Sequence, residues 1–237
     1  MSVRKEQLAE NVTLYLGDCA GFDFSDFYGS AALVSDVPYG MAHDTDSTRF
    51  TGGQHKRGDG RADWGAIVGD SKPFDPTPWL RFRECIMWGS NHYAARLPVG
   101  CTLVWIKKAP HLFGTFLSDA EVAWQSGGHG VYIHYEQFPP PSRIAESGDG
   151  RVAHSTQKPV GLMEWCIGRT KASLILDPYM GNGTTGVAAI RQGRGFVGCE
   201  LSSRHFDTAC RRISDELRRP RLFAEPVAKP VQEALFG

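Results

Sequence analysis

The sequence predicts a single α/β domain whose core is a mostly parallel, twisted sheet with helices on both faces. The chain has 237 residues, which is long enough for one such domain with a substantial core. Four short apolar runs, typical of buried strands, each end next to an acidic residue. Over residues 173–189 a strand pattern, a glycine-rich turn and an apolar helical pattern follow one another. Strands that alternate with helices favour an open α/β sheet.

The acidic residues that follow the four apolar runs are Asp18, Asp36, Asp177 and Glu200. If the strands are parallel, these carboxylates collect at the carboxyl edge of the sheet, where open α/β sheets bind ligands. A single carboxylate in this position usually caps a helix or forms a turn. Four of them are hard to explain by capping alone, so the pattern indicates a binding site.

The glycine-rich turn is Gly181-Asn182-Gly183, and Thr184 and Thr185 open the helix after it. Glycine permits positive φ and a close approach of the backbone to a ligand, and the first N–H groups of a helix are free to bind one. An ordinary strand-to-helix turn has the same pattern, so this stretch alone leaves both interpretations open.

The first half of the chain is predicted to contain four strands and a few short helices. Apolar runs indicate strands over residues 12–16, 31–35, 85–88 and 101–106. Short helical segments are expected over residues 21–28 and 91–96. Another helix is expected to open at Asp75, because prolines follow it within the first turn.

The second half is predicted to hold four shorter strands and three helices. Residues 121–124 and 131–135 are expected to form an antiparallel pair, with loops at 139–142 and 147–150. Parallel strands are expected before Asp177 and before Glu200, with the helix opened by Thr184 between them. The other two helices have apolar faces formed by Leu162, Met163, Cys166 and Ile167 after Pro159, and by Phe206, Ala209, Cys210, Ile213 and Leu217 over about residues 202–218.

Composition excludes few functions. The 26 basic and 26 acidic residues give no net charge, which neither demands nor excludes nucleic acid. The six cysteines form no C-x-x-C pair and mostly lie in apolar runs, so we expect reduced thiols in a cytoplasmic protein. His129 and His134 are a weak metal-ligand pair, and no metal is expected. The N-terminal residues lack a signal-peptide pattern and no apolar run is long enough to cross a membrane.

Five motifs in a fixed order carry a resemblance to a known family. They are Gly17-Asp18-Cys19, Asp36-Val-Pro-Tyr39, His154-Ser-Thr-Gln-Lys-Pro159, Asp177-Pro-Tyr-Met-Gly-Asn-Gly-Thr-Thr185 and Phe196-Val-Gly-Cys-Glu200. In these motifs the chain resembles the β group of the amino-methylating DNA methyltransferases, the D-P-P-Y type that acts on adenine N6 or cytosine N4. The resemblance covers residues 12–215. It implies a Rossmann-like, S-adenosylmethionine-dependent methyltransferase fold with a permuted motif order.

The resemblance implies a cofactor site at the carboxyl edge of the sheet. It implies that Glu200 binds the ribose hydroxyls, that Asp18 lies near the adenine, and that Asp177 holds the methionine part. Lys158 either helps at the methionine end or only fixes the turn. The full set of implied cofactor residues is Asp18, Cys19, Gln157, Lys158, Asp177, Tyr179, Gly181, Gly183, Thr184 and Glu200.

The catalytic residues implied by the resemblance are Asp36, Val37, Pro38 and Tyr39. The Asp36 carboxylate and the Val37 carbonyl would accept the two N–H bonds of an exocyclic amine, and Tyr39 would stack on a base flipped out of the duplex. Val37 departs from the family, which usually has proline here. Its carbonyl survives, but the fixed φ of proline is lost, so we expect a looser loop.

The implied activity is methyl transfer from S-adenosylmethionine to adenine N6 in double-stranded DNA, as in restriction–modification systems. Aspartate at position 36 favours adenine, and cytosine N4 is the alternative within the same family. Methylation of RNA or of a protein amide, and a DNA-binding relic that retains cofactor, are further alternatives. The chain contains no recognisable helix-turn-helix or zinc module, so we expect a short target site or a homodimer.

The predicted domain organisation is one methyltransferase domain over residues 1–219 and a tail over 220–237. A mobile loop at 41–65 carries four basic residues that either contact DNA phosphates or are merely solvated, namely Arg49, Lys56, Arg57 and Arg61. Residues 109–153 are the candidate target-recognition insertion. In the tail, Gln232, Leu235 and Phe236 resemble a peptide that docks on the bacterial sliding clamp, or else fold back on their own domain.

Overall fold

The computed structural model describes residues 4–41, 70–115, 118–147 and 157–220. Several predictions lie outside the described residues and stay predictions. They are the 41–65 loop beyond Met41, with Arg49, Lys56, Arg57 and Arg61; the motif residues His154, Ser155 and Thr156; and the tail with Gln232, Leu235 and Phe236.

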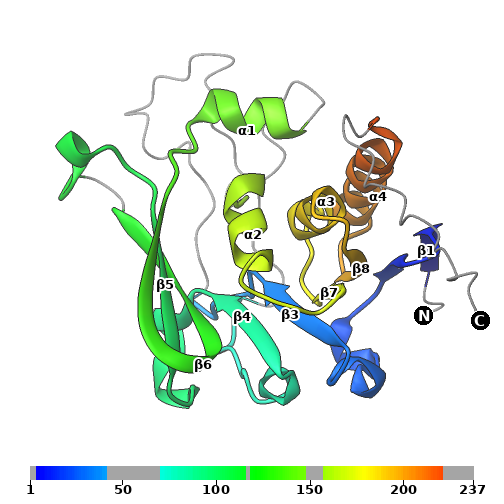
Figure 1. Ribbon diagram of the computed structural model, residues 1–237, viewed down its shortest axis with the longest axis horizontal. Coiled ribbons are helices and arrows are strands. Elements are labelled where there is room, and N and C mark those ends of the chain that lie inside the picture. Colours follow the sequence, from blue (N-terminus) through cyan, green and yellow to red (C-terminus); the bar gives the residue numbers. More distant parts are fainter. Residues whose placement is uncertain (1–3, 42–69, 116–117, 148–156, 221–237) are drawn as a thin grey trace, which may run out of the picture.

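An eight-stranded sheet in the order β1-β2-β8-β7-β3-β4-β6-β5 forms the core of the described chain (Figure 1). The strands are β1 (Arg4–Ala9), β2 (Val12–Leu16), β3 (Ala31–Ser35), β4 (Glu84–Trp88), β5 (Gly100–Ile106), β6 (Ala120–Tyr135), β7 (Leu174–Asp177) and β8 (Gly195–Glu200). The α/β fold predicted from the apolar runs is confirmed.

The five central strands, β2, β8, β7, β3 and β4, are mutually parallel. Their register aligns the strand ends, because Leu16 pairs with Glu200 and Asp177 pairs with Gly198. All four predicted carboxylates therefore lie at the end of, or just beyond, a parallel strand. The predicted collection of acidic residues at one edge of the sheet is confirmed.

The two ends of the sheet differ from the prediction. The sequence Arg-Lys-Glu-Gln-Leu-Ala of β1 shows no apolar run, yet it pairs antiparallel with β2 as a half-exposed edge strand. The two strands predicted at 121–124 and 131–135 are the arms of one bent strand, β6, which turns at Gly127 and Gly128 with positive φ. The arms do run in opposite directions, but they pair with β5, which lies between them, instead of with each other.

Four α-helices lie on one side of the sheet (Figure 1). They are α1 (Pro140–Ser147), α2 (Val160–Ile167), α3 (Thr184–Arg191) and α4 (Ser203–Arg218). The predicted apolar faces of α2 and α4 are confirmed, because their residues join one core cluster with the strands. Residues 139–142, predicted as a loop, instead lead into α1, because proline fits the first turn of a helix.

The opposite face of the sheet carries no α-helix within the described residues. Short 3₁₀ turns and loops cover it, and their aromatic side chains, including Phe24, Trp79 and Phe82, fill a second core cluster. In place of the helix predicted over 21–28 the structure has the 3₁₀ turn Ser25–Phe27, with another 3₁₀ turn, Cys19–Gly21, just before it. The helix expected at Asp75 is only the turn Trp79–Arg81. Prolines at 76 and 78 remove two N–H donors from that stretch, which explains the short turn.

The backbone after the Asp36–Tyr39 tetrapeptide is anchored at a narrow neck formed by Gly40, Met41 and Asp70. The buried Asp70 carboxylate accepts a hydrogen bond from the Gly40 N–H at 2.6 Å and another from the Met41 N–H at 3.3 Å. Gly40 has φ of 73°, and an added Cβ would lie 2.3 Å from the Lys72 carbonyl oxygen. The chain therefore leaves and re-enters the described structure at nearly the same point.

In the described part of the chain no helix combines the length and apolar character needed to span a bilayer. The six cysteines are all free thiols, four of them buried.

Candidate active site

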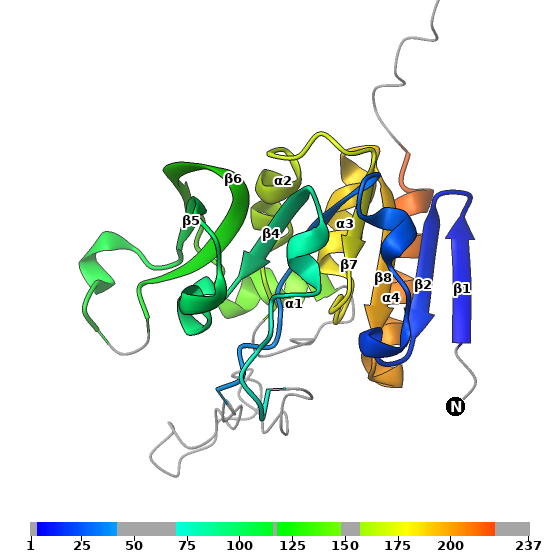
Figure 2. The same ribbon diagram turned by 90° about the horizontal axis from the view of Figure 1, so that it is seen from below.

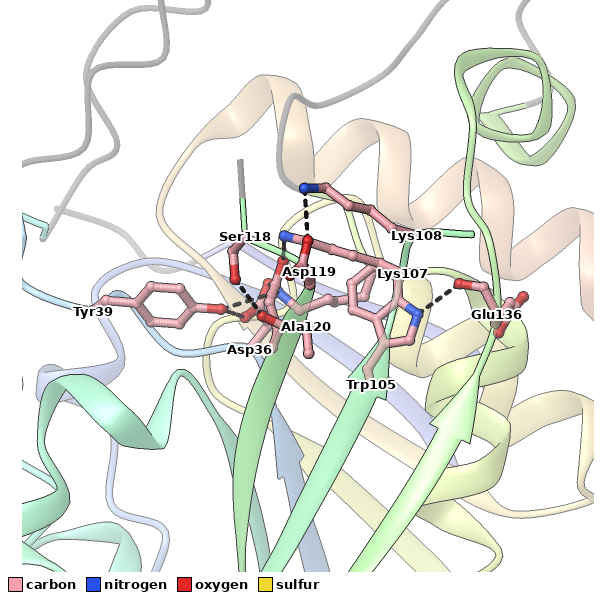
Figure 3. A network of polar contacts seen from close by, with 11 residues as sticks. Asp36, Tyr39, Trp105, Lys107, Lys108, Ser118, Asp119, Ala120 and Glu136 are labelled. Atoms are coloured by element: carbon pink, nitrogen blue, oxygen red, sulfur yellow. Dashed lines mark hydrogen bonds and ion pairs between the residues drawn. The ribbon is translucent and has the colours of Figure 1, made fainter. Parts of the chain in front are cut away.

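The tetrapeptide Asp36-Val37-Pro38-Tyr39 directly follows β3 at the carboxyl edge of the sheet. The Asp36 carboxylate is held at both oxygens: Oδ1 accepts the Tyr39 hydroxyl at 2.8 Å, and Oδ2 accepts the Lys158 ammonium at 2.7 Å (Figure 3). The Val37 side chain is buried in the second core cluster. This packing compensates for part of the rigidity that is lost because the residue is not proline. A carboxylate offers about four lone-pair sites, so acceptor capacity remains for a ligand.

The Tyr39 ring is fixed by two neighbours. It stacks on the exposed His92 ring with centroids 5.0 Å apart and an interplanar angle of 12°. It also lies against Gly89, which has φ of 75°; an added Cβ there would lie 2.0 Å from a Tyr39 ring carbon. A base that stacks on Tyr39 must therefore use ring surface that His92 leaves free, or displace His92.

Lys158 lies at the Asp36–Tyr39 tetrapeptide. Its ammonium contacts the carboxylates of Asp36 and, at 3.0 Å, Glu121, and it donates to the Tyr39 hydroxyl at 3.0 Å. Burial alone would lower the pKa of Lys158, but the two carboxylates raise that pKa well above its usual range. Burial raises the pKa of Asp36, and Lys158 opposes the rise. Lys158 is therefore charged, and it favours the ionised form of Asp36.

Asp177 organises the glycine-rich turn from within. Its buried carboxylate accepts hydrogen bonds from the Ser35 hydroxyl at 2.7 Å, the Thr185 hydroxyl at 2.6 Å and the Tyr179 N–H at 3.0 Å. Burial raises the pKa of Asp177 to about 6, although these donors oppose the rise. Because the Asp177 carboxylate accepts three hydrogen bonds from the protein itself, its role is to shape the glycine-rich turn that a ligand would contact.

Glu200 ends β8 and bridges the turn to the start of α4. Its two carboxylate oxygens accept the Gly181 N–H at 3.0 Å and the Ser202 N–H at 2.7 Å. Asp18, at the end of β2, accepts the Ala20 N–H at 2.9 Å. Each of these carboxylates keeps lone pairs for a ligand hydroxyl.

Some of the remaining predicted cofactor residues lie at the carboxyl edge of the sheet, and others pack against helix α4. The Tyr179 ring packs edge-on against Trp79 and lies beside Cys19, whose pKa is raised to about 11 by burial. The Thr184 hydroxyl instead accepts a hydrogen bond at 3.2 Å from Arg212 of α4. Gly183 begins α3 with φ of 77° and packs against Ala209, and Gly181 has φ of 51° with open space around it.

Two buried amides near this edge fit a polar ligand. The Gln157 side chain is 8% exposed, and within the described residues neither its Oε1 nor its Nε2 has a hydrogen-bond partner. The Nδ2 of Asn182, in the glycine-rich turn, is likewise buried without a partner in the part of the chain described. Buried polar groups are normally paired, so these donors and acceptor suit a bound molecule that supplies the missing partners.

Sequence reasoning missed several residues of this site. Ser35 and Thr185 hold Asp177, and Gly89 and His92 hold Tyr39. Glu121 comes from β6, far from any motif. Thr185 could have been found, because it lies within the motif that begins at Asp177. Nothing in the sequence connects Glu121 to Asp36.

A family model described as "DNA methylase", for the N6/N4 methyltransferases, matches residues 74–211. The chain belongs to this family. The match spans more than half of the chain and includes the glycine-rich turn, β8 and Lys158.

Curated relatives share part of the chain. The type II methyltransferase M.HinfI of Haemophilus influenzae is 38% identical over 69 residues, covering 28% of this chain and 19% of the relative. The DNA adenine methyltransferase YhdJ of Escherichia coli is 31% identical over 116 residues, covering 42% of this chain and 40% of the relative. The chain therefore spans well under half the length of either of these relatives.

Solved structures confirm the methyltransferase fold. The M1.HpyAVI–SAM complex superposes with a TM-score of 0.53 at 20% identity, covering 84% of this chain and 98% of that one. The PvuII DNA methyltransferase, named as cytosine-N4-specific, gives a TM-score of 0.53 at 14% identity, covering 94% and 92%. At these low sequence identities the two superpositions show a common fold and nothing further.

The buried Asp177 gives this DNA methylase a testable pH dependence. Because the folded pKa, about 6, exceeds the ordinary value of 3.8, the folded state binds the proton more tightly than the unfolded state. The contribution of Asp177 to stability is therefore greatest below pH 4 and is lost as the pH rises through about 6, by about 3 kcal/mol in total. In urea unfolding, the free energy of the wild type minus that of Asp177→Asn should fall over this range. Parallel pH profiles for the two proteins would contradict the assignment.

Proposed function

We propose that the protein is an S-adenosylmethionine-dependent DNA methyltransferase that methylates the exocyclic N6 amine of a flipped-out adenine. The observation that carries the proposal is the position of the Asp36–Tyr39 tetrapeptide. It lies at the same sheet edge as Asp177 and Glu200, one strand away from the glycine-rich turn. Membership of the DNA methylase family supports it, as do the side-chain amide of Gln157 and the Nδ2 of Asn182, which have no hydrogen-bond partner among the described residues.

In this proposal the cofactor supplies a methyl group already activated on a sulfonium, and the residues of the chain position the weak nucleophile. The Asp36 carboxylate and the Val37 carbonyl accept hydrogen bonds from the two N–H groups of the amine. The nitrogen lone pair is then available to the methyl carbon. With S-adenosylmethionine bound, the two acceptors would hold the amine nitrogen in place to take the methyl group, and the proton that the methylated amine gives up would pass to solvent. Alignment of this kind contributes roughly 7–11 kcal/mol in well-oriented reactions.

The cofactor would bind across the glycine-rich turn. Glu200 and Asp18 are proposed to accept hydrogen bonds from ribose and adenine, and Gln157 with Gly181 and Gly183 to hold the methionine part. Double-stranded DNA is the proposed substrate, contacted in part by the basic residues of the 41–65 loop. The homodimer and the clamp-docking tail remain further proposals about partners.

Cytosine N4 is the second candidate target. The fold does not favour adenine, since the PvuII enzyme, which is named as cytosine-N4-specific, shares it. Aspartate at position 36 and the name of the YhdJ relative favour adenine.

Methyl transfer to mixed-sequence DNA, followed by nucleoside analysis, tests the activity and the target together. N6-methyladenine is the expected product, N4-methylcytosine would establish the alternative, and no methylated nucleoside would leave only a relic. S-adenosylmethionine at 100 times its Kd should raise the free energy of unfolding by about 2.7 kcal/mol, because it binds the native state.

Glu200→Ala should reduce the stabilisation by S-adenosylmethionine. Glu84→Ala is the matched control, because Glu84 also accepts backbone N–H groups, those of Lys171 and Ala172, but lies at the start of β4. An equal loss of ligand response in both variants would contradict the proposed role of Glu200.

A further inference from the structure

The Lys158 ammonium is buried between two other segments of the chain. Its side chain is 5% exposed, and its contacts go to Asp36 after β3, Tyr39 in the same loop, and Glu121 at the start of β6. An ammonium has three donors, and these three contacts account for all of them. Lys158 itself immediately precedes Pro159, the N-cap of α2, so its backbone is fixed by the helix.

Glu121 has a second cation of its own. Its Oε1 accepts the Lys107 ammonium at 2.7 Å, while Oε2 contacts Lys158 at 3.0 Å. The two lysines lower the pKa of Glu121 to about 2 against the effect of burial. Asp36, Lys158, Glu121 and Lys107 thus form a chain of alternating charges with no net charge.

Burying such a chain is not an efficient way to stabilise a fold. Desolvation of the charges opposes their attraction, and apolar replacements of similar volume are often as stable. The network does, however, fix the direction of both Asp36 oxygens, because Tyr39 and Lys158 each hold one. That orientation matters only if Asp36 has to present its remaining lone pairs to another group.

We propose that Lys158 and Glu121 are positioning residues that hold the Asp36 carboxylate in the orientation required by the exocyclic amine. Lys158 contacts the carboxylate directly, and Glu121 fixes the Lys158 ammonium from the opposite side. The proposal rests on the proposed methyl transfer. It adds a role for Glu121 of β6, a strand that carries none of the recognised motifs, in holding Asp36 through Lys158.

The test compares single-turnover methyl-transfer rates at saturating DNA and S-adenosylmethionine. Lys158→Met should lower the rate by about 10²-fold, the loss expected for a misplacement of about 1 Å. Glu121→Gln should lower it less, because Lys158 keeps its contact with Asp36. The KM values for both substrates should change little in either variant, because Asp36, Tyr39 and Glu121 take up all three donors of the Lys158 ammonium. The cofactor contact that the resemblance implied for Lys158 would instead predict a raised KM for S-adenosylmethionine in Lys158→Met.

A double variant separates positioning from charge balance. Lys158→Met leaves two buried carboxylates with one cation and is expected to lower the melting temperature. In Lys158→Met/Glu121→Gln one positive and one negative charge are removed together, so the melting temperature should recover while the rate stays low. Recovery of the rate in the double variant would overturn the proposal, because the network would then only balance charge.

The neighbouring pair Lys108–Asp119 provides the matched control (Figure 3). This ion pair is 2.8 Å long and lies beside the network, but neither residue contacts Asp36 in the described structure. Lys108→Met should keep the rate within about twofold, in line with the small effects of partly exposed ion pairs. An equal loss in Lys108→Met and Lys158→Met would also overturn the proposal.

The pH profile provides an independent readout. The groups that face Asp36 are Lys158, Glu121, Tyr39, Asp177 and Tyr93. Removing Lys158 removes a cation, so the acidic limb of kcat/KM should move to higher pH; Glu121→Gln removes an anion and should move it to lower pH. Shifts in the same direction would contradict the arrangement. A wild type without activity would refute the proposed function itself. An active wild type with unaffected variants would refute only the positioning role of Lys158 and Glu121.

Discussion

Replacement of Asp36 by alanine is expected to lower the methyl-transfer rate by about 10³-fold or more while leaving binding of S-adenosylmethionine nearly unchanged. Asp36 is assigned to the target amine, and loss of one preorganised group at a reacting centre costs about 10²–10³-fold. The further loss comes from Lys158, which no longer has its carboxylate partner at 2.7 Å. Single-turnover kinetics measure the rate, and the ligand-induced shift in melting temperature reports cofactor binding.

Asp36→Asn provides the graded comparison. Asparagine keeps one acceptor oxygen and the shape of the side chain, so its rate should lie between those of the wild type and Asp36→Ala. The melting shift should persist in both variants, which shows that the fold and the cofactor site are intact. A wild-type rate in Asp36→Ala would mean that the reaction is carried by other residues.

Gly89→Ala is expected to have the second largest effect, on both stability and rate. The residue has φ of 75°, and its new Cβ would lie 2.0 Å from the Tyr39 ring. Left-handed backbone costs about 1–2 kcal/mol for a non-glycine residue, and the clash adds to it. Because the ring has to move, methyl transfer should fall by about 10²-fold. Thermal unfolding and single-turnover assays on the same sample measure the two effects.

Gly114→Ala separates backbone strain from the clash. Gly114 has φ of 74°, but nothing lies within 4 Å of a Cβ built there. It should therefore show the strain alone, with a normal rate. In Gly89→Ala/Tyr39→Ala the clash is removed, so stability should recover relative to Gly89→Ala while the rate stays low. Equal destabilisation by Gly89→Ala and Gly114→Ala would show that the Tyr39 contact is unimportant.

The central part of the fold was predictable because its signals are local. Buried parallel strands are continuous apolar runs, and four of the five here end at or next to a carboxylate, so Asp36, Asp177 and Glu200 could be placed at one edge. The apolar faces of α2 and α4 follow from helical periodicity. None of this requires knowledge of which segments meet in space.

The outer strands and the support of Asp36 depend on long-range contacts. The polar β1 is a strand because β2 offers a free edge, not because of its own composition. The bend of β6 around β5 is set by Gly127 and Gly128 together with the pairing of both arms. Glu121 reaches Lys158 because the first arm of β6 pairs with β4 and β5, and because Lys158 directly precedes α2. A single sequence contains no signal for either contact.

The neck at Gly40 and Asp70 has a consequence for how the sequence between these two residues can change. The hydrogen bond from the Gly40 N–H to Asp70 closes the chain at that point, so residues 42–69 join the domain through two adjacent ends. Each doubling of the length of a closed loop costs only about 0.6 kcal/mol of closure entropy. Insertions, deletions or exchanges between these ends can therefore accumulate while Asp36 to Tyr39 keep their places.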